Sequence, residues 1–168
     1  MKAVMISIKP KWCEKIANSD KTIEVRKTRP KIDTPFKCYI YCTQGENLWR
    51  TQKGVQSKTE LAGYLMNGKV IGHFVCDNVY PIKNQYSGFV VANATQGETN
   101  EIARQSCLDY DDMVSYLGNK DGYAWHISDL VIYEQPKDVS EFFTPFGKRP
   151  SYMLERPFQS WGYVEEKE

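Results

Sequence analysis

Hydrophobic positions along this chain predict a series of short strands and only two or three short helices. Strand-like runs rich in β-branched and aromatic residues occur at residues 3–8, 21–28, 36–43, 69–79, 85–96 and 123–133. Loops rather than regular helices join most of these runs, which argues against a doubly wound parallel sheet. We therefore expect an α+β fold, a mixed β-barrel of about six strands with helices at its ends.

Helical spacing is found in two regions of the sequence. Residues 10–17 carry an apolar stripe, and Pro10 suits the first turn of a helix. Asn18 can take the left-handed conformation that ends such a helix. Residues 98–117 predict a helix in two pieces, with Asp109 as the N-cap of the second piece.

The length of the chain, 168 residues, is enough for one domain with a sizeable core, so we expect a single domain over residues 1–168. Residues 44–59 are polar and show little periodicity. We expect a flap or insertion there, with Trp49 as its anchor.

Charge is distributed unevenly, although the formal net charge is only +1. Residues 1–37 contain ten Lys and Arg against four Asp and Glu, whereas the remainder contains twelve against seventeen. This asymmetry predicts one positive face rather than a uniformly basic surface.

The five cysteines are odd in number and none has CxxC spacing. Cys38 and Cys42 share a strand face about 13 Å apart at ~3.3 Å per residue, beyond disulfide reach. We expect reduced, buried thiols in a cytoplasmic protein. With two histidines, no zinc signature and no phosphate-binding glycine loop, we expect neither a metal nor a cofactor. No signal peptide or membrane-spanning stretch is visible in the sequence.

The stretch Lys21-Thr22-Ile23-Glu24-Val25-Arg26 is the strongest candidate for function. Glu24 and Arg26 are two residues apart on a strand, so they point to the same face, and Lys21 stands at the strand entrance. These three side chains predict a small polar pocket with Lys21 at its rim. The alternative is an exposed ion pair of little energetic consequence.

Other side chains have both a structural and a functional interpretation. Trp12 suits core packing or base stacking, Tyr41 and Tyr39 suit a stacking face or the barrel lining, and His126 suits a structural role or a catalytic base. The full set of candidate ligand-binding residues is Lys9, Trp12, Lys21, Glu24, Arg26, Tyr41, His126 and Trp161.

The order strand, helix, polar turn and KTIEVRK resembles the signature of ASCH domains, which belong to the PUA-like group of RNA-associated β-barrels. Residues 68–77 (GKVIGHFVCD), 123–130 (YAWHISDL) and 156–166 (RPFQSWGYVEE) also resemble segments of bacterial and phage ASCH proteins. Ser19 stands where the family pattern has glycine. The resemblance implies a PUA-like barrel with a basic cleft, between the first helix and the sheet, for RNA or a nucleobase.

Some small members of this group are similar to amidohydrolases that cleave acyl groups from modified cytidine. The resemblance places their catalytic lysine at Lys21, their threonine at Glu24 and their helix-proximal glutamate at Ser106. Two of the three positions therefore depart from the amidohydrolase pattern.

We expect an RNA- or nucleotide-binding domain that recognises single-stranded RNA or a modified nucleobase, with no membrane partner. The first alternative is a hydrolase acting on a modified nucleoside amide or on RNA, with Lys21 and Glu24 catalytic. The second alternative is a protein-interaction module. Whether the protein is an enzyme, and its oligomeric state, are left open by the sequence.

Overall fold

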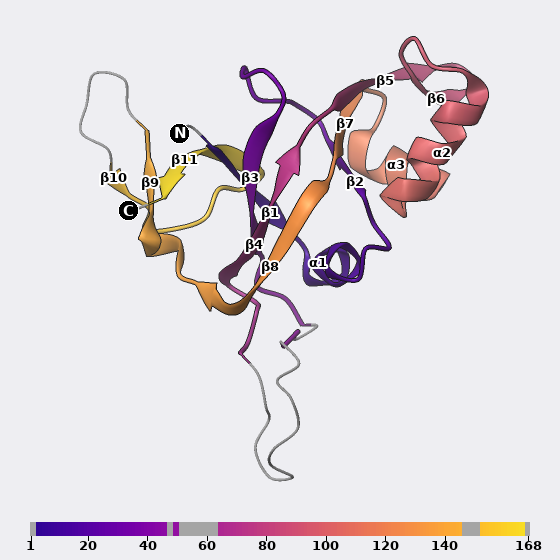
Figure 1. The fold of residues 1–168 in the computed structure, drawn as a ribbon. Helices are drawn as coiled ribbons and strands as arrows, with labels where there is room; N and C mark the ends of the chain where they lie inside the picture. The colour runs from indigo at the N-terminus through magenta and orange to yellow at the C-terminus, as the bar shows by residue number, and fades with distance from the viewer. Residues whose placement is uncertain (1–2, 47–48, 51–63, 146–151, 167–168) are drawn as a thin grey trace, which may run out of the picture. The chain divides into compact units, whose positions relative to one another are not determined.

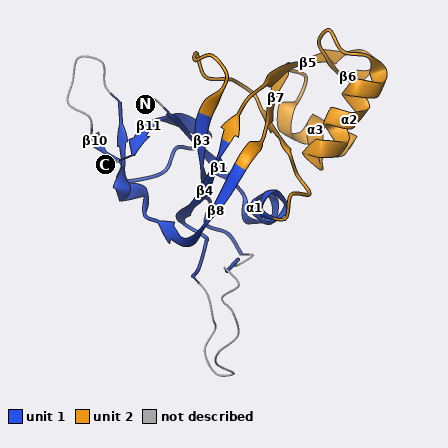
Figure 2. Ribbon diagram, viewed as in Figure 1, with its two compact units in different colours: residues 1–17, 37–74, 130–168 blue, residues 18–36, 75–129 orange. Residues whose placement is uncertain are grey.

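The computed structural model describes residues 3–46, 49–50, 64–145 and 152–166. The chain divides into two compact units (Figure 2). Unit 1 consists of residues 1–17, 37–74 and 130–168, and unit 2 consists of residues 18–36 and 75–129. Each unit is described by itself below.

Unit 1 is built on a seven-stranded mixed sheet with the order β10-β9-β11-β1-β3-β4-β8 (Figure 1). The central strand β1 pairs in parallel with β3 and antiparallel with β11. All six residues of β1 are buried, as its mostly apolar sequence predicts. The strands are β1 (Ala3–Ile8), β3 (Phe36–Cys42), β4 (Lys69–Cys76), β8 (Ser128–Lys137), β9 (Phe142–Thr144), β10 (Tyr152–Met153) and β11 (Trp161–Glu166).

The first helix, α1 (Pro10–Ala17), confirms the predicted element and its apolar stripe. Cys13 and Ile16 are fully buried on that stripe. The left-handed residue after the helix is Ser19, with φ of 63°, and not Asn18 as we expected. A short 3₁₀ helix, η1 (Val139–Glu141), joins β8 to β9.

Gly72 lies where β4 and β8 approach each other closely. A Cβ atom at this position would collide with the backbone carbonyl of Val131. The glycine in the predicted strand therefore permits a close approach of two backbones, which a larger residue would allow only with a shift.

Unit 2 contains a four-stranded antiparallel sheet with the order β2-β7-β5-β6. Its apolar core consists of sheet residues such as Ile23, Val25 and Ala124, against which residues of the two helices pack. The elements are β2 (Ile23–Arg26), β5 (Val79–Gln85), β6 (Gly88–Val91), α2 (Gln96–Ser106), α3 (Tyr110–Leu117) and β7 (Gly122–His126).

Side-chain caps fix the beginnings of both helices in unit 2. The Thr95 hydroxyl accepts from the Glu98 backbone N–H, while the Glu98 carboxylate accepts from the Thr95 N–H, a complete capping box. The Asp109 carboxylate accepts from the Asp112 N–H at 2.7 Å, which confirms the predicted cap of α3.

The six-strand barrel is corrected by the structure. The described residues form eleven strands in sheets of seven and four, and they form no closed barrel. The α+β class and the small number of short helices are confirmed. The expected flap at residues 44–59 lies largely outside the described residues, although Trp49 is described and its backbone N–H donates to the Asn67 side chain at 2.8 Å.

The sequence predicted reduced, buried cysteines and no membrane-spanning stretch. All five cysteines are free, and the expected burial is found for all of them but Cys107. None of the helices in the described part of the chain has the length and apolarity of a membrane span.

Candidate functional site

Strand β2 separates the polar and apolar side chains of the KTIEVRK stretch onto two faces. Glu24 is paired with Trp125 of β7, and Arg26 is paired with Tyr123. Because directly opposite residues of antiparallel strands share a face, these four side chains lie on one side of the sheet. Val25, on the other side, packs into the apolar core of unit 2.

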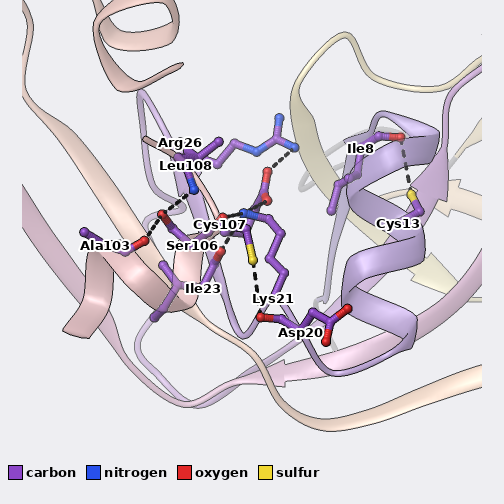
Figure 3. Close-up of polar contacts among 11 residues, drawn as sticks. Ile8, Cys13, Asp20, Lys21, Ile23, Arg26, Ala103, Ser106, Cys107 and Leu108 are labelled. Carbon is purple, nitrogen blue, oxygen red and sulfur yellow. Dashed lines mark hydrogen bonds and ion pairs between the residues drawn. The ribbon is translucent and has the colours of Figure 1, made fainter. Parts of the chain in front are cut away.

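The segment before β2 is fixed to the end of α2. The Thr22 N–H donates to the Gln105 carbonyl at 3.0 Å, and the Cys107 thiol donates to the Asp20 carbonyl at 3.3 Å (Figure 3). Cys107 itself adopts a left-handed conformation with φ of 56°, which turns the chain out of the helix. Lys21 is thereby held beside the carboxyl end of α2.

Lys21 makes the densest set of polar contacts in the site. Its Nζ donates to the Ser106 carbonyl at 2.6 Å and to the Ile23 carbonyl at 2.7 Å, as Figure 3 shows. The Glu24 carboxylate lies 3.3 Å from the same nitrogen. An ammonium group has three N–H donors, so three acceptors match its full capacity. The partial negative charge at the carboxyl end of α2 also favours a cation at this place.

Glu24 bridges two cations. Its Oε1 lies 2.9 Å from an Arg26 guanidinium nitrogen, and its Oε2 faces Lys21. We call Lys21, Glu24 and Arg26 the charged cluster. Its formal charge is +1, because one carboxylate offsets only one of the two cations.

Burial decides between the two interpretations of these residues. The exposed fractions are 1% for Lys21, 7% for Glu24 and 6% for Arg26. An exposed surface ion pair is therefore excluded. Lys21 is the most deeply buried of the three, and not a residue at the rim as the sequence suggested.

Arg26 has a further neighbour in Tyr116 of α3. Burial raises the pKa of Tyr116, and the adjacent positive charge of Arg26 opposes that rise. Tyr116 also lies under the Lys27 ammonium, 5.3 Å from its ring centroid. The phenol therefore belongs to the surroundings of the cluster, although the sequence did not single it out.

Ser106, which occupies the position of a catalytic glutamate in the resemblance, acts here through its backbone. Its hydroxyl donates to the Ala103 carbonyl at 2.7 Å and accepts from the Leu108 N–H at 3.2 Å (Figure 3). Both contacts belong to the end of α2, while the Ser106 carbonyl receives Lys21. Because every residue type has such a carbonyl, no sequence signal could have revealed this contact.

His126 lies in unit 2, but apart from the charged cluster. It is paired with Ile23, so its side chain shares the face of Ile23 and not that of Glu24. Its Nδ1 contacts the Asp77 carboxylate at 2.6 Å. This contact gives His126 a structural partner, and Asp77 was not predicted from the sequence.

The other candidate residues, Lys9, Trp12, Tyr41 and Trp161, belong to unit 1. Tyr41 is only 6% exposed and lies in the core, which corresponds to the lining interpretation and not to an exposed stacking face. Trp12 is half-buried, with the Lys11 ammonium 4.3 Å from its ring centroid. The expected cleft that combines these residues with the charged cluster stays a prediction.

Comparisons with known proteins give a structural likeness only. No protein-family model matches the chain, and no curated protein matches it. Among solved structures, ASCH from Zymomonas mobilis matches with a TM-score of 0.54 at 15% identity, covering 97% of this chain and 87% of that chain. The chain has an ASCH-like fold.

Two mutants of the Zymomonas ASCH protein match equally well. A tyrosine-to-phenylalanine mutant covers 98% of this chain and 91% of its own, with a TM-score of 0.54 and 15% identity. A serine-to-alanine mutant covers 97% and 88%, with the same score and identity. At this identity, the likeness establishes the ASCH-like architecture alone.

Proposed function

We propose that this protein is an RNA- or nucleotide-binding domain that recognises single-stranded RNA or a modified nucleobase at the charged cluster. The observation that carries the proposal is the burial of Lys21, Glu24 and Arg26 in mutual contact. The ASCH-like fold supports it, because the resemblance implies the same class of ligand.

Stability alone is a weak reason for such a cluster. Replacing a buried ion pair by apolar residues of similar volume is often neutral or stabilising. Binding of a ligand that needs a fixed cation and a fixed acceptor explains the charged cluster better than stability does. The Arg26 guanidinium suits a phosphate or carbonyl oxygen, and the Glu24 carboxylate suits an exocyclic amine or a ribose hydroxyl.

A hydrolase remains the second candidate because Lys21 and Glu24 are in contact at 3.3 Å. A nucleophilic or basic lysine must present a lone pair, however, and the Lys21 nitrogen lies among two accepting carbonyls and the Glu24 carboxylate, a set of partners suited to an ammonium group. The Ser106 hydroxyl is likewise engaged within α2. This geometry favours binding over catalysis.

Fluorescence anisotropy with a labelled single-stranded RNA tests the proposal. We expect Arg26→Ala to weaken binding by about 1–3 kcal/mol, because it removes a charge-assisted hydrogen bond. Arg104→Ala, at an exposed arginine of the same unit, is the matched control and should change little. Thermal unfolding of both variants distinguishes a defect in binding from a defect in folding.

Salt dependence provides the second arm of this test. Affinity for RNA should fall as salt rises, because phosphate contacts release counterions. If a partner binds with an affinity that changes neither with salt nor with Arg26→Ala, the protein is instead an interaction module.

A further inference from the structure

A second feature of unit 2 begins directly after Arg26. The loop at residues 27–33, together with Tyr123 of β7, lines a hollow of about 500 Å³ that is open to solvent. This volume falls within the range of about 300–1,000 Å³ that is typical of ligand pockets. We call it the loop hollow.

Its lining is rich in positive charge. Lys27, Arg29 and Lys31 contribute three cations, against the single carboxylate of Asp33. Nε and Nη2 of Arg29 donate to the carbonyls of Pro30 and Ile32, each at 3.3 Å. Carbonyls orient the guanidinium without neutralising it, so the loop holds this charge in a fixed direction.

Tyr123 connects the loop hollow to the charged cluster. It lines the hollow, and it is also the residue paired with Arg26 across β2 and β7. Opposite side chains in such a pair have Cβ atoms about 4.5–5.5 Å apart. The half-buried phenol ring is therefore placed between the two features and offers a face on which a base can stack.

We propose that the loop hollow binds the phosphate and base of a second nucleotide, next to one bound at the charged cluster. The ligand class is then a single-stranded oligonucleotide and not a free nucleoside. The three loop cations meet phosphate oxygens, and Tyr123 stacks on the base. This inference rests on the proposed function, because the first nucleotide is the one assigned to the charged cluster.

The test compares a short fluorescein-labelled single-stranded RNA with unlabelled nucleoside monophosphates. Lys27→Gln combined with Lys31→Gln should weaken RNA binding roughly tenfold, the size of one charge-assisted hydrogen bond. The slope of log affinity against log salt should become shallower by about 0.7 for each phosphate that the variant no longer neutralises. Lys31→Gln alone should leave monophosphate binding unchanged, because Lys31 lies outside the charged cluster and its surroundings.

Tyr123→Leu examines stacking separately. We expect it to weaken RNA binding at least fivefold, since base–aromatic stacking is worth roughly 1–3 kcal/mol per base. Lys120→Gln, at an exposed lysine of unit 2 outside the hollow, is the control and should leave RNA binding unchanged.

The outcomes distinguish this inference from the proposed function. RNA binding that Arg26→Ala weakens, but that the loop and Tyr123 variants leave unchanged, would overturn the assignment of the loop hollow and keep the proposed function. If the wild-type protein binds neither RNA nor monophosphates, the loop hollow assignment and the proposed function are both overturned. Equal affinity for polyglutamate and RNA would show a general anion surface and would also overturn the nucleotide assignment.

Discussion

Glu24 determines whether two buried cations can remain together in unit 2. Its two oxygens face Lys21 at 3.3 Å and Arg26 at 2.9 Å. Without this carboxylate, both cations would lose their ion pair with Glu24 while staying in a poorly hydrated place. Removing one member of a buried charge pair is costly for this reason.

Glu24→Gln should therefore lower the free energy of unfolding by about 3–5 kcal/mol, the usual cost of leaving a buried charge uncompensated. Urea unfolding measures the change. Glu134→Gln, at an exposed glutamate of β8, is the matched control and should stay within about 0.5 kcal/mol of the wild type. A change as small as that of the control would show that Glu24 does not hold the cluster together.

At the scale of residues, the sequence predicted the pairing of Glu24 with Arg26 but not the depth of Lys21. The period of two residues along a strand fixes which side chains share a face. Burial of Lys21 depends on the end of α2, whose Ser106 carbonyl comes from a residue 85 positions away. Local spacing contains no information about such a contact.

Among the elements of unit 1, β3, β8 and β11 meet at Glu166. Its carboxylate accepts a hydrogen bond from the Tyr39 hydroxyl at 2.6 Å and forms an ion pair with Lys137. Burial opposes ionisation of Glu166, but the hydrogen bonds from Lys137 and Tyr39 and the nearby lysine charges outweigh it and lower its pKa. Burial, together with the same carboxylate, raises the pKa of Tyr39.

This lowered pKa makes the stability of unit 1 depend on pH. A carboxylate whose pKa is lower in the folded state stabilises the protein above its unfolded pKa, and the effect disappears as pH falls through the folded value. Glu166→Gln should cost about 1–2 kcal/mol at neutral pH, since the group is partly exposed and its contacts are charge-assisted.

Chemical unfolding of Glu166→Gln and the wild type across acidic pH measures this linkage. The difference in unfolding free energy should shrink as pH falls below the usual range of a glutamate, and it should vanish once Glu166 is protonated. A difference that is the same at acidic and neutral pH would contradict the assignment.

Element boundaries show where sequence patterns stop being informative. The predicted strand at residues 69–79 is two strands, β4 and β5, separated at Asp77 and Asn78. The runs of apolar residues on either side look continuous, although the chain leaves one sheet and enters the other between them. The capping hydrogen bonds of α2 and α3 join residues that are close in the sequence. The sequence alone therefore sufficed to predict Asp109 as the cap of α3.

For the whole molecule, the predicted barrel failed because strand patterns specify faces and not partners. β2 pairs with β7 in the four-stranded sheet, whereas β1, which precedes it, pairs with β3 and β11. Short strands such as β9 and β10 contain three and two residues, too few for an alternating pattern to be recognised.

The assembled site predicts little or no deacylation of acyl-cytidine. Glu24 and Ser106 replace two of the three catalytic residues that the resemblance implies, and Lys21 donates to two backbone carbonyls beside the Glu24 carboxylate. Incubation of the protein with acyl-cytidine, followed by chromatography of released cytidine, measures this activity. Turnover that disappears in Lys21→Ala would make the hydrolase the leading function.

The most direct measurement is a crystal structure of the protein with a short single-stranded RNA. Our account predicts one nucleotide in contact with Arg26 and Glu24, and the next with its base against Tyr123 and its phosphate among the cations of the loop at residues 27–33. RNA bound solely to residues of unit 1, with both the charged cluster and the loop hollow free of nucleotide, would contradict the account.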